Sequence, residues 1–171
     1  VTDGMTAAPP PGWSVVRSDC LAFLEGLEPE SLDLIATDPA YSGLNNHMKF
    51  GHGRIVGRYQ DPANEKWMPE WTDSPERFLQ FLELCRRALR PGRHLYVMFD
   101  SFSLLSLGHL VREVFEVKNL IAWDKVALGM GHYYRRRHEF VLFASKGKRK
   151  LLHQGFPDVW QIRRIVRARY P

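Results

Sequence analysis

Short apolar segments alternate with amphipathic, helix-like segments along most of this chain. Residues 32–37 and 94–99 are apolar runs of strand length, and each is followed by residues that stop a strand. Residues 75–90 and 103–114 place apolar side chains at the three- and four-residue spacing of one helical face. This alternation predicts an α/β sandwich around a mostly parallel sheet.

Two further features specify the expected sheet. Residues 32–37 are mostly apolar, which predicts a strand buried on both faces. The segments 117–123 and 139–144 are also predicted to be strands, and only a loop separates them. They are therefore expected to form an antiparallel hairpin at one edge of the sheet.

Capping residues mark the expected helix ends. Ser74-Pro75-Glu76 combines an N-cap residue, a proline at the first helical position and an acid in the first turn, and Pro91-Gly92 should stop that helix. A short strand is expected at Trp13–Arg17. A helix from Cys20 to about Gly26 should follow it, with Ser18-Asp19 supplying the N-cap.

Length and composition predict one soluble domain. Residues 1–12 are rich in Pro, Ala and Thr and are expected to form a disordered tail, with a single domain over residues 13–171. No apolar run has the length of a membrane span and the start has no secretory signal, so a cytoplasmic location is the default. Two cysteines make no disulfide framework, and no His or Cys spacing indicates a metal site.

Positive charge is concentrated toward the end of the chain. Residues 135–171 carry 11 basic and 2 acidic side chains, whereas residues 1–134 carry 13 basic and 17 acidic ones. Such asymmetry is typical of a protein that binds a polyanion such as DNA, although a solvated basic tail would look the same. Tyr133, Tyr134, Arg135, Arg136 and Arg137 are the predicted nucleic-acid contacts, and an ordinary basic hairpin tip is the alternative.

The string Asp38-Pro39-Ala40-Tyr41 follows the first apolar run. Ligands in α/β sheets bind beyond the carboxyl ends of the strands, and this string is expected at such an end. A carboxylate, a stiff proline bend with a free carbonyl and an aromatic ring are therefore predicted together at the sheet edge. The structural alternative is an Asx-type turn with a packed tyrosine.

With these residues in place, the sequence from Val15 to Pro171 resembles the DNA adenine-N6 and cytosine-N4 methyltransferases, in particular their permuted beta class. The second proline of that family's Asp-Pro-Pro-Tyr signature is Ala40 here. The other strings that carry the resemblance, in the family's order, are Ser18–Leu21, Arg90–Gly92, Trp123–Lys125 with Gly131, and Arg137–Gly147.

The resemblance implies a three-layer, Rossmann-like methyltransferase fold. It also implies a site-specific DNA methyltransferase that uses S-adenosylmethionine to methylate an exocyclic amine of adenine or cytosine. Asp38, Pro39 and Tyr41 would be catalytic, and Asp19, Cys20, Asp38 and Asp100 would bind the cofactor. The aromatic ring would hold a base that has left the duplex. An aspartate at position 38 favours adenine, but the target base stays open, as do a homodimer and a cognate restriction enzyme.

One departure concerns the family's Phe-x-Gly-x-Gly turn, which binds the cofactor. No glycine-rich turn precedes Asp38, and in the permuted class the turn lies after a His-Pro-x-x-Lys-Pro segment. The chain stops at Pro171, where that segment should begin, so a fragment whose fold is incomplete at the C-terminus is expected. Two alternatives follow: a DNA-binding remnant without turnover, or a protein-glutamine or RNA methyltransferase. The last is disfavoured, because those families keep the glycine turn upstream of their Asn-Pro-Pro-Tyr string.

Overall fold

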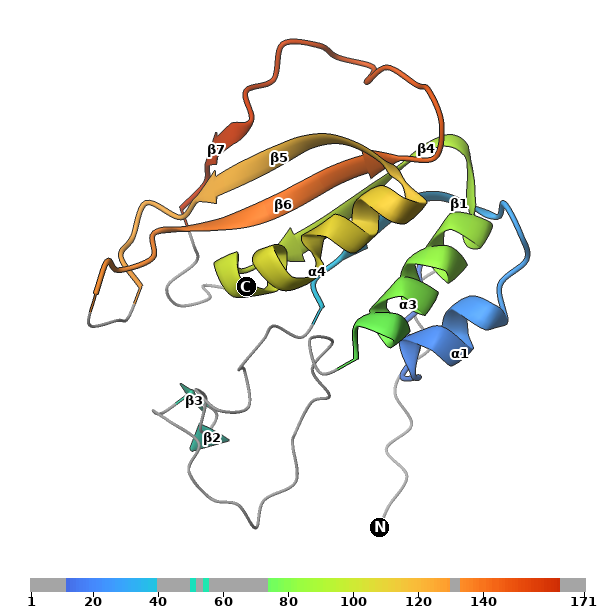
Figure 1. The fold of residues 1–171 in the computed structure, drawn as a ribbon, viewed down its shortest axis with the longest axis horizontal. Helices are drawn as coiled ribbons and strands as arrows, with labels where there is room; N and C mark the ends of the chain where they lie inside the picture. The colour runs from blue at the N-terminus through green and yellow to red at the C-terminus, as the bar shows by residue number, and fades with distance from the viewer. Residues whose placement is uncertain (1–11, 40–49, 52–53, 56–73, 130–132, 164–171) are drawn as a thin grey trace.

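The computed structural model describes residues 12–39, 50–51, 54–55, 74–129 and 133–163 (Figure 1). The helices are α1 (Cys20–Glu25), α3 (Pro75–Ala88) and α4 (Ser101–Val114). The strands of the main sheet are β1 (Leu32–Thr37), β4 (Leu89–Phe99), β5 (Glu116–Asp124), β6 (His138–Ser145) and β7 (Val159–Gln161). A separate antiparallel pair consists of β2 (Phe50–Gly51) and β3 (Arg54–Ile55).

The main sheet has five strands in the order β1-β4-β6-β5-β7. β1 is parallel to β4 and β7 is parallel to β5, while β6 is antiparallel to both of its neighbours. Four strands therefore run in one direction and only β6 runs in the other, which confirms a mostly parallel α/β sheet. The predicted β5–β6 hairpin is confirmed too, but it lies one strand in from the edge because the short β7 pairs with β5.

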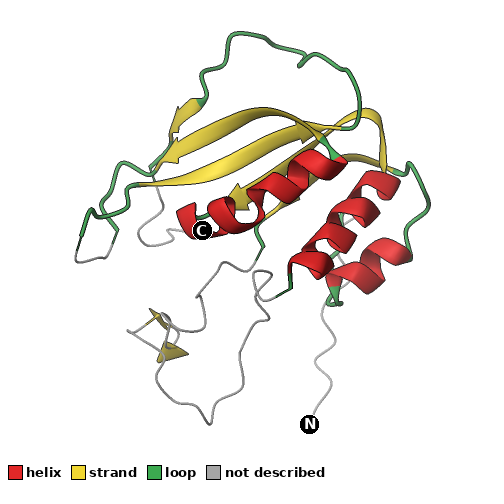
Figure 2. Cartoon of the chain, viewed as in Figure 1, coloured by secondary structure: helices red, strands yellow, loops and turns green. Residues whose placement is uncertain are grey.

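The helices all cover one face of this sheet (Figure 2). The main hydrophobic core lies between them and β4, where Phe78, Leu82, Leu95, Val97 and Phe99 are fully buried. The opposite face carries a smaller apolar cluster and, among the described residues, no helix. The described part of the chain thus provides two of the three expected layers.

The helix predicted from Ser74 begins as expected. The Ser74 hydroxyl accepts a hydrogen bond from the Arg77 amide at 3.4 Å, and Pro75 occupies the first turn. The helix ends at Ala88, however, and β4 already begins at Leu89 and runs through Pro91-Gly92, which was predicted to stop the helix. Tertiary pairing decides this boundary: Leu89 pairs with Leu32 of β1, and the Gly92 amide donates to the Lys146 carbonyl at 2.6 Å.

The predicted helix after Ser18-Asp19 is α1, and Asp19 is its N-cap. One Asp19 carboxylate oxygen accepts the amides of Leu21 and Ala22 at 3.0 and 3.3 Å. At the other end of α1, the Arg87 side chain of α3 donates to the carbonyls of Leu24, Glu25 and Leu27. A long-range arginine therefore satisfies backbone groups that a helix of 6 residues cannot satisfy itself.

Two expectations near the N-terminus are wrong. Trp13–Arg17 forms no strand, and Val15 is 82% exposed, because no described strand offers it a ladder of hydrogen bonds. β1 is not buried on both faces: none of its residues is buried, and Leu34 is 56% exposed. The reason is position, since β1 is the outer strand of the described sheet and only its inner flank is paired.

Two further expectations concern the N-terminal tail and membrane-spanning segments. Residues 1–11 of the predicted tail lie outside the described residues, so the division at residue 12 stays a prediction. None of the described helices has the length and apolar character needed to cross a bilayer.

Candidate active site

Three aspartates follow the ends of three parallel strands. Asp38 comes after β1, Asp100 after β4, and Asp124 is the last residue of β5. Because these strands run in the same direction, their carboxyl ends meet at one edge of the sheet; Thr37 pairs with Val97 and Asp124 with His138 of β6. This is the edge at which α/β sheets bind ligands.

Asp38 is exposed at this edge, and the following Pro39 is half-buried. The exposure of Asp38 is compatible with a ligand-facing carboxylate, and the Asx-type turn stays an alternative prediction. Ala40 and Tyr41 lie outside the described residues, so the predicted stacking role of Tyr41 stays a prediction.

Asp100 has two structural contacts. Its Oδ1 accepts the Ser103 amide at 2.8 Å and so caps α4, while its Oδ2 pairs with Arg136 at 3.2 Å. The Arg136 guanidinium also lies over the Phe102 ring, 4.8 Å from the ring centroid. Asp100 therefore joins the start of α4 to the loop between β5 and β6.

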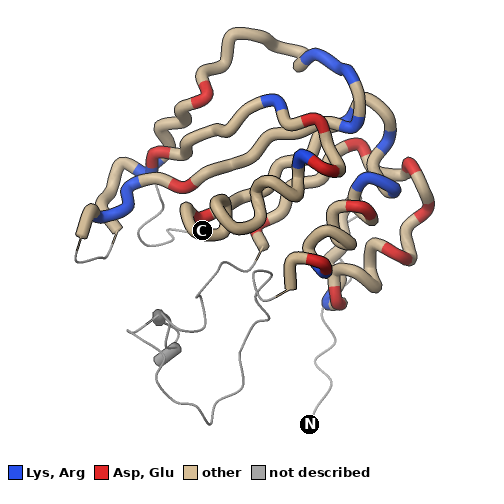
Figure 3. The backbone as a smooth tube through the Cα atoms, viewed as in Figure 1, with Lys and Arg blue, Asp and Glu red and all other residues tan. Residues whose placement is uncertain are grey.

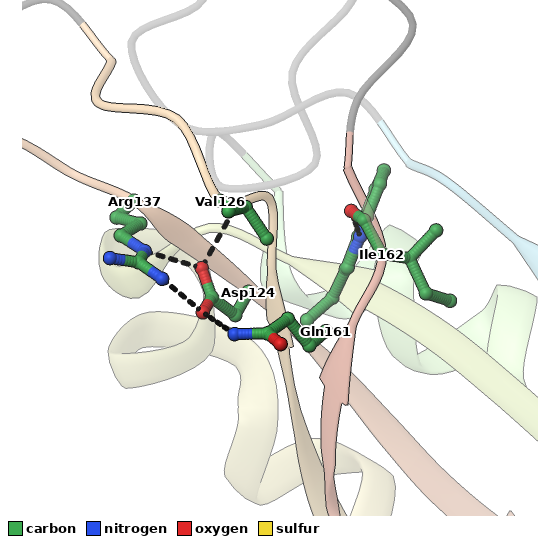
Figure 4. A network of polar contacts seen from close by, with 6 residues as sticks. Asp124, Val126, Arg137, Gln161 and Ile162 are labelled. Carbon is green, nitrogen blue, oxygen red and sulfur yellow. Dashed lines mark hydrogen bonds and ion pairs between the residues drawn. The ribbon is translucent and has the colours of Figure 1, made fainter.

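Asp124 is the centre of a larger polar network (Figure 4). Arg137 donates from Nε and Nη2 to the two carboxylate oxygens at 2.6 and 2.7 Å, a bidentate pair. The Val126 amide donates to Oδ1 at 2.8 Å, and Gln161 of β7 reaches Oδ2 at 3.5 Å. The hydrogen bonds from Arg137, followed by the one from Val126, hold the pKa of Asp124 far below its ordinary 3.8.

The network holds an otherwise unfavourable loop. Val126 has a φ of +54°, a left-handed conformation that β-branched residues rarely adopt. Further along, the Gly129 amide donates to the Arg136 carbonyl at 2.6 Å, and a Cβ at Gly129 would lie 2.8 Å from that oxygen. The two sides of the loop are thus hydrogen-bonded to each other, and the Asp124 network fixes the end of the loop that joins β5 and β6.

We expect Asp124→Ala to loosen this loop without unfolding the sheet. Amide hydrogen exchange at Val126 and Gly129 should accelerate about tenfold, since the carboxylate that holds the strained turn is lost. Asp158→Ala is the matched control, because Asp158 is exposed and only its backbone carbonyl forms a described bond. Equal exchange in both variants would show that the backbone bonds hold the loop alone.

The same network predicts a pH dependence. A carboxylate whose pKa is lowered on folding stabilises the protein above its unfolded pKa and loses that contribution as the pH falls. The Asp124 contribution should therefore be complete at neutral pH and decline progressively below about pH 4. Asp124→Ala should flatten this part of the stability profile, which urea denaturation at a series of pH values would measure.

The predicted DNA-contact residues lie on this loop and divide into two kinds. Tyr133 and Tyr134 are fully exposed, at 95% and 102%. The three arginines are engaged: Arg135 donates to the Gly129 carbonyl at 2.8 Å, and Arg136 and Arg137 pair with Asp100 and Asp124. Two of the three positive charges are therefore balanced by neighbouring carboxylates.

Asp19 and Cys20, two of the predicted cofactor residues, lie at the start of α1. Besides capping the helix, Asp19 pairs with Arg77 of α3 at 2.6 Å. Cys20 is half-buried, and burial, followed by the Asp19 charge, raises the pKa of its thiol. Both residues therefore have clear structural roles.

The described residues do not complete a site for S-adenosylmethionine. Asp19 and Asp100 are occupied by cap and ion-pair contacts, and Gly129, the described glycine in the loop after β5, is followed by β6 rather than by a helix. The cofactor roles of Asp19, Cys20, Asp38 and Asp100 stay predictions. Among the described side chains, no group of three or more His, Cys, Asp or Glu could hold a metal ion.

The sequence analysis assigns no role to Asp124, the residue with the largest described network at this edge. Trp123-Asp124-Lys125 served there only as part of the resemblance to the family. Its partner Arg137 stands thirteen positions away, across a loop whose path the sequence does not give.

Comparison with known proteins places these residues in a family. The family model described as DNA methylase (N6_N4_Mtase) matches residues 32–167. The type II methyltransferase M.HhaII of Haemophilus parahaemolyticus is 33% identical over 137 residues, covering 72% of this chain and 54% of that protein.

Two solved structures share the fold. PvuII DNA methyltransferase (cytosine-N4-specific) has a TM-score of 0.61 at 18% identity, over 90% of this chain and 58% of that one. A putative DNA modification methylase from Thermus thermophilus, complexed with S-adenosyl-L-methionine, has a TM-score of 0.53 at 15% identity, over 83% and 65%. This chain spans about half the length of the curated relatives that it matches.

Proposed function

Because this chain belongs to the N6/N4 DNA methylase family, we propose that it is the part of a DNA methyltransferase that activates the target amine. The complete protein would transfer a methyl group from S-adenosylmethionine to the exocyclic amine of adenine or cytosine in DNA. Relatives named type II methyltransferases support this reaction class, as does the structural neighbour named as cytosine-N4-specific.

The observation that carries the proposal is the place of Asp38. Its carboxylate is exposed directly after β1, at the ligand-binding edge of the sheet, within the residues that match the family. A buried carboxylate or one at the opposite edge would not meet a substrate there.

The chemistry follows from the weak nucleophilicity of a ring amine. Its lone pair is delocalised into the base, so acceptors for its two N–H bonds would localise the pair on nitrogen. Asp38 would accept one N–H bond and the Pro39 carbonyl the other, which is preorganised polar stabilisation of the reacting group. Tyr41 would stack on the everted base and exclude water from one of its faces.

The cofactor is inferred from the family, because the described residues alone do not form its site. S-adenosylmethionine supplies the methyl group when bound, and one of the structural neighbours was solved in complex with it. Asp38 would hold the amine during transfer, and Tyr133 and Tyr134 would contact the DNA beside it. The predicted homodimer and the predicted restriction partner stay predictions.

Digestion and mass spectrometry of DNA treated with the complete gene product tests the proposal. We expect N6-methyladenine, because the string begins with Asp38, and N4-methylcytosine would keep the reaction class while changing the base. Unmodified DNA under conditions in which the protein binds both DNA and cofactor would contradict the proposal.

A second function is that the isolated chain binds DNA without turnover, since the described residues alone do not complete a cofactor site. Calorimetry of this chain with S-adenosylmethionine separates the two functions. Binding of the cofactor would remove the second one, and DNA affinity without cofactor binding would favour it.

A further inference from the structure

A cleft of about 540 Å³ lies on the face of the sheet that the helices leave open. It is bounded by the sheet and by the segment between β6 and β7, which arches away from the sheet in Figure 1. Asp38, Asp100 and Asp124 do not line it. The cleft is therefore separate from the candidate active site, and its volume is that of a small-ligand site.

The wall of the cleft is a group of aromatic rings. Tyr96 and Phe143 stack with centroids 4.8 Å apart at an interplanar angle of 22°, and His94 lies 5.0 Å from Phe143. Trp160 of β7 and Phe156 of the arching segment complete this lining, and Phe156 is 69% exposed. Partial burial raises the pKa of Tyr96, so its phenol is neutral. A flat apolar ring is the shape that such a surface accepts.

One polar group in the wall is unsatisfied. The Nε2 atom of His94 is excluded from solvent and has no hydrogen-bond partner in the described part of the chain. A buried polar atom without a partner is costly. Because water does not reach Nε2, a ligand in the cleft would contact the His94 ring rather than this atom.

The rim of the cleft is basic. Lys148, Arg149 and Lys150 are consecutive and exposed, and Arg149 and Lys150 line the cleft. Figure 3 shows basic residues (blue) on the backbone of the segment that leads from β6 toward β7. None of the three has an ion pair with another described residue.

Two acidic side chains also line the cleft. Asp33 pairs with Arg90 and Arg93 at 2.9 and 3.0 Å, and the hydrogen bond from Arg90, with a smaller effect of the Arg149 charge, lowers the pKa of Asp33. Asp158 has no ion pair with another described residue. The charged lining residues are therefore Arg93, Arg149 and Lys150 against Asp33 and Asp158, a positive excess of one charge.

We propose that this cleft binds a nucleotide unit, with the base against the aromatic wall and the phosphate against Arg149 and Lys150. Stacking rings beside unpaired cations are what proteins use to hold unpaired nucleotides of a single strand. The proposal rests on the proposed function in taking DNA as the source of the nucleotide, and it adds a second contact away from Asp38. A free mononucleotide has the same chemistry and is distinguished by the test.

The test measures binding of a fluorescently labelled octathymidylate to this chain by anisotropy over a range of salt concentrations. Arg149→Gln/Lys150→Gln should lower the salt exponent by about 1.4, at about 0.7 per lost phosphate contact to a single strand. If the plots of log affinity against log salt concentration for the variant and the wild type meet at about 1 M salt, the variant should bind about 25-fold more weakly at about 0.1 M. Arg17→Gln/Arg112→Gln, which removes two exposed charges elsewhere, is the matched control.

A second experiment tests the aromatic contact. Phe156→Ala should weaken binding about tenfold, whereas Phe23→Ala on α1, which is also exposed, should not. An oligonucleotide carrying 5-iodouracil should photo-cross-link to Phe156, Trp160 or Tyr96. Competition by thymidine monophosphate would identify the free nucleotide as the ligand, and displacement by oligonucleotides alone would identify a strand.

The proposal is overturned if Arg149→Gln/Lys150→Gln keeps the wild-type salt exponent, or if every cross-link falls outside the cleft. These readouts do not depend on methyl transfer. If the complete protein methylates DNA but the cleft variants bind normally, only the cleft assignment fails. If the cleft variants lose binding but no methylation is found, only the proposed function fails.

Discussion

Replacing Asp38 by alanine in the complete protein should reduce methyl transfer about 1000-fold while DNA affinity stays within about twofold. The exposed carboxylate beyond β1 would act on the amine and not on phosphates, so its loss should raise the barrier and leave binding unchanged. Single-turnover incorporation of labelled methyl groups measures the first quantity, and anisotropy with labelled duplex measures the second.

The control for this prediction is Glu113→Ala. Glu113 lies on α4, is exposed, and forms no ion pair with another described residue. Exposed substitutions of this kind change stability little, so that variant should transfer methyl groups nearly as well as the wild type. Transfer by Asp38→Ala within about tenfold of the wild type would remove Asp38 from the proposed chemistry.

Replacing Phe78 by alanine should lower the free energy of unfolding by about 4 kcal/mol. Phe78 is completely buried between α3 and β4, with its ring 6.0 Å from that of Phe81 and 6.1 Å from that of Phe99. Removing it takes apolar surface out of the core and leaves a cavity beside the strand that leads to Asp100. Since a domain is stable by only about 5–15 kcal/mol, a large share of the stability would be lost.

Urea denaturation of this chain measures the effect, with Leu105→Ala as the control. Leu105 lies on α4 but is 81% exposed, so its truncation should change stability by less than about 0.5 kcal/mol. A loss below about 1.5 kcal/mol for Phe78→Ala would mean that the core does not depend on this contact. Intact secondary structure in both variants would show that the difference reflects packing.

Local signals in the sequence predicted most of the elements and the place of Asp38. Ser74-Pro75 begins α3 and Asp19 caps α1, because capping needs only nearby backbone amides. The β5–β6 hairpin and the alternation of strands and helices were predictable for the same reason, since periodicity is a property of short segments.

What the sequence by itself determined is the order of elements and the chemistry available at each strand end. Tertiary structure decided which groups remain free. Pairing of Leu89 with Leu32 moved the start of β4, and the outer position of β1 left Leu34 exposed. Folding also brought Arg136 to Asp100 and Arg137 to Asp124, so that these two positive charges are balanced by carboxylates far away in the sequence. Charge balance and strand pairing depend on residues far apart in the chain, whereas capping and periodicity do not, and that separation divides what could be predicted from what could not.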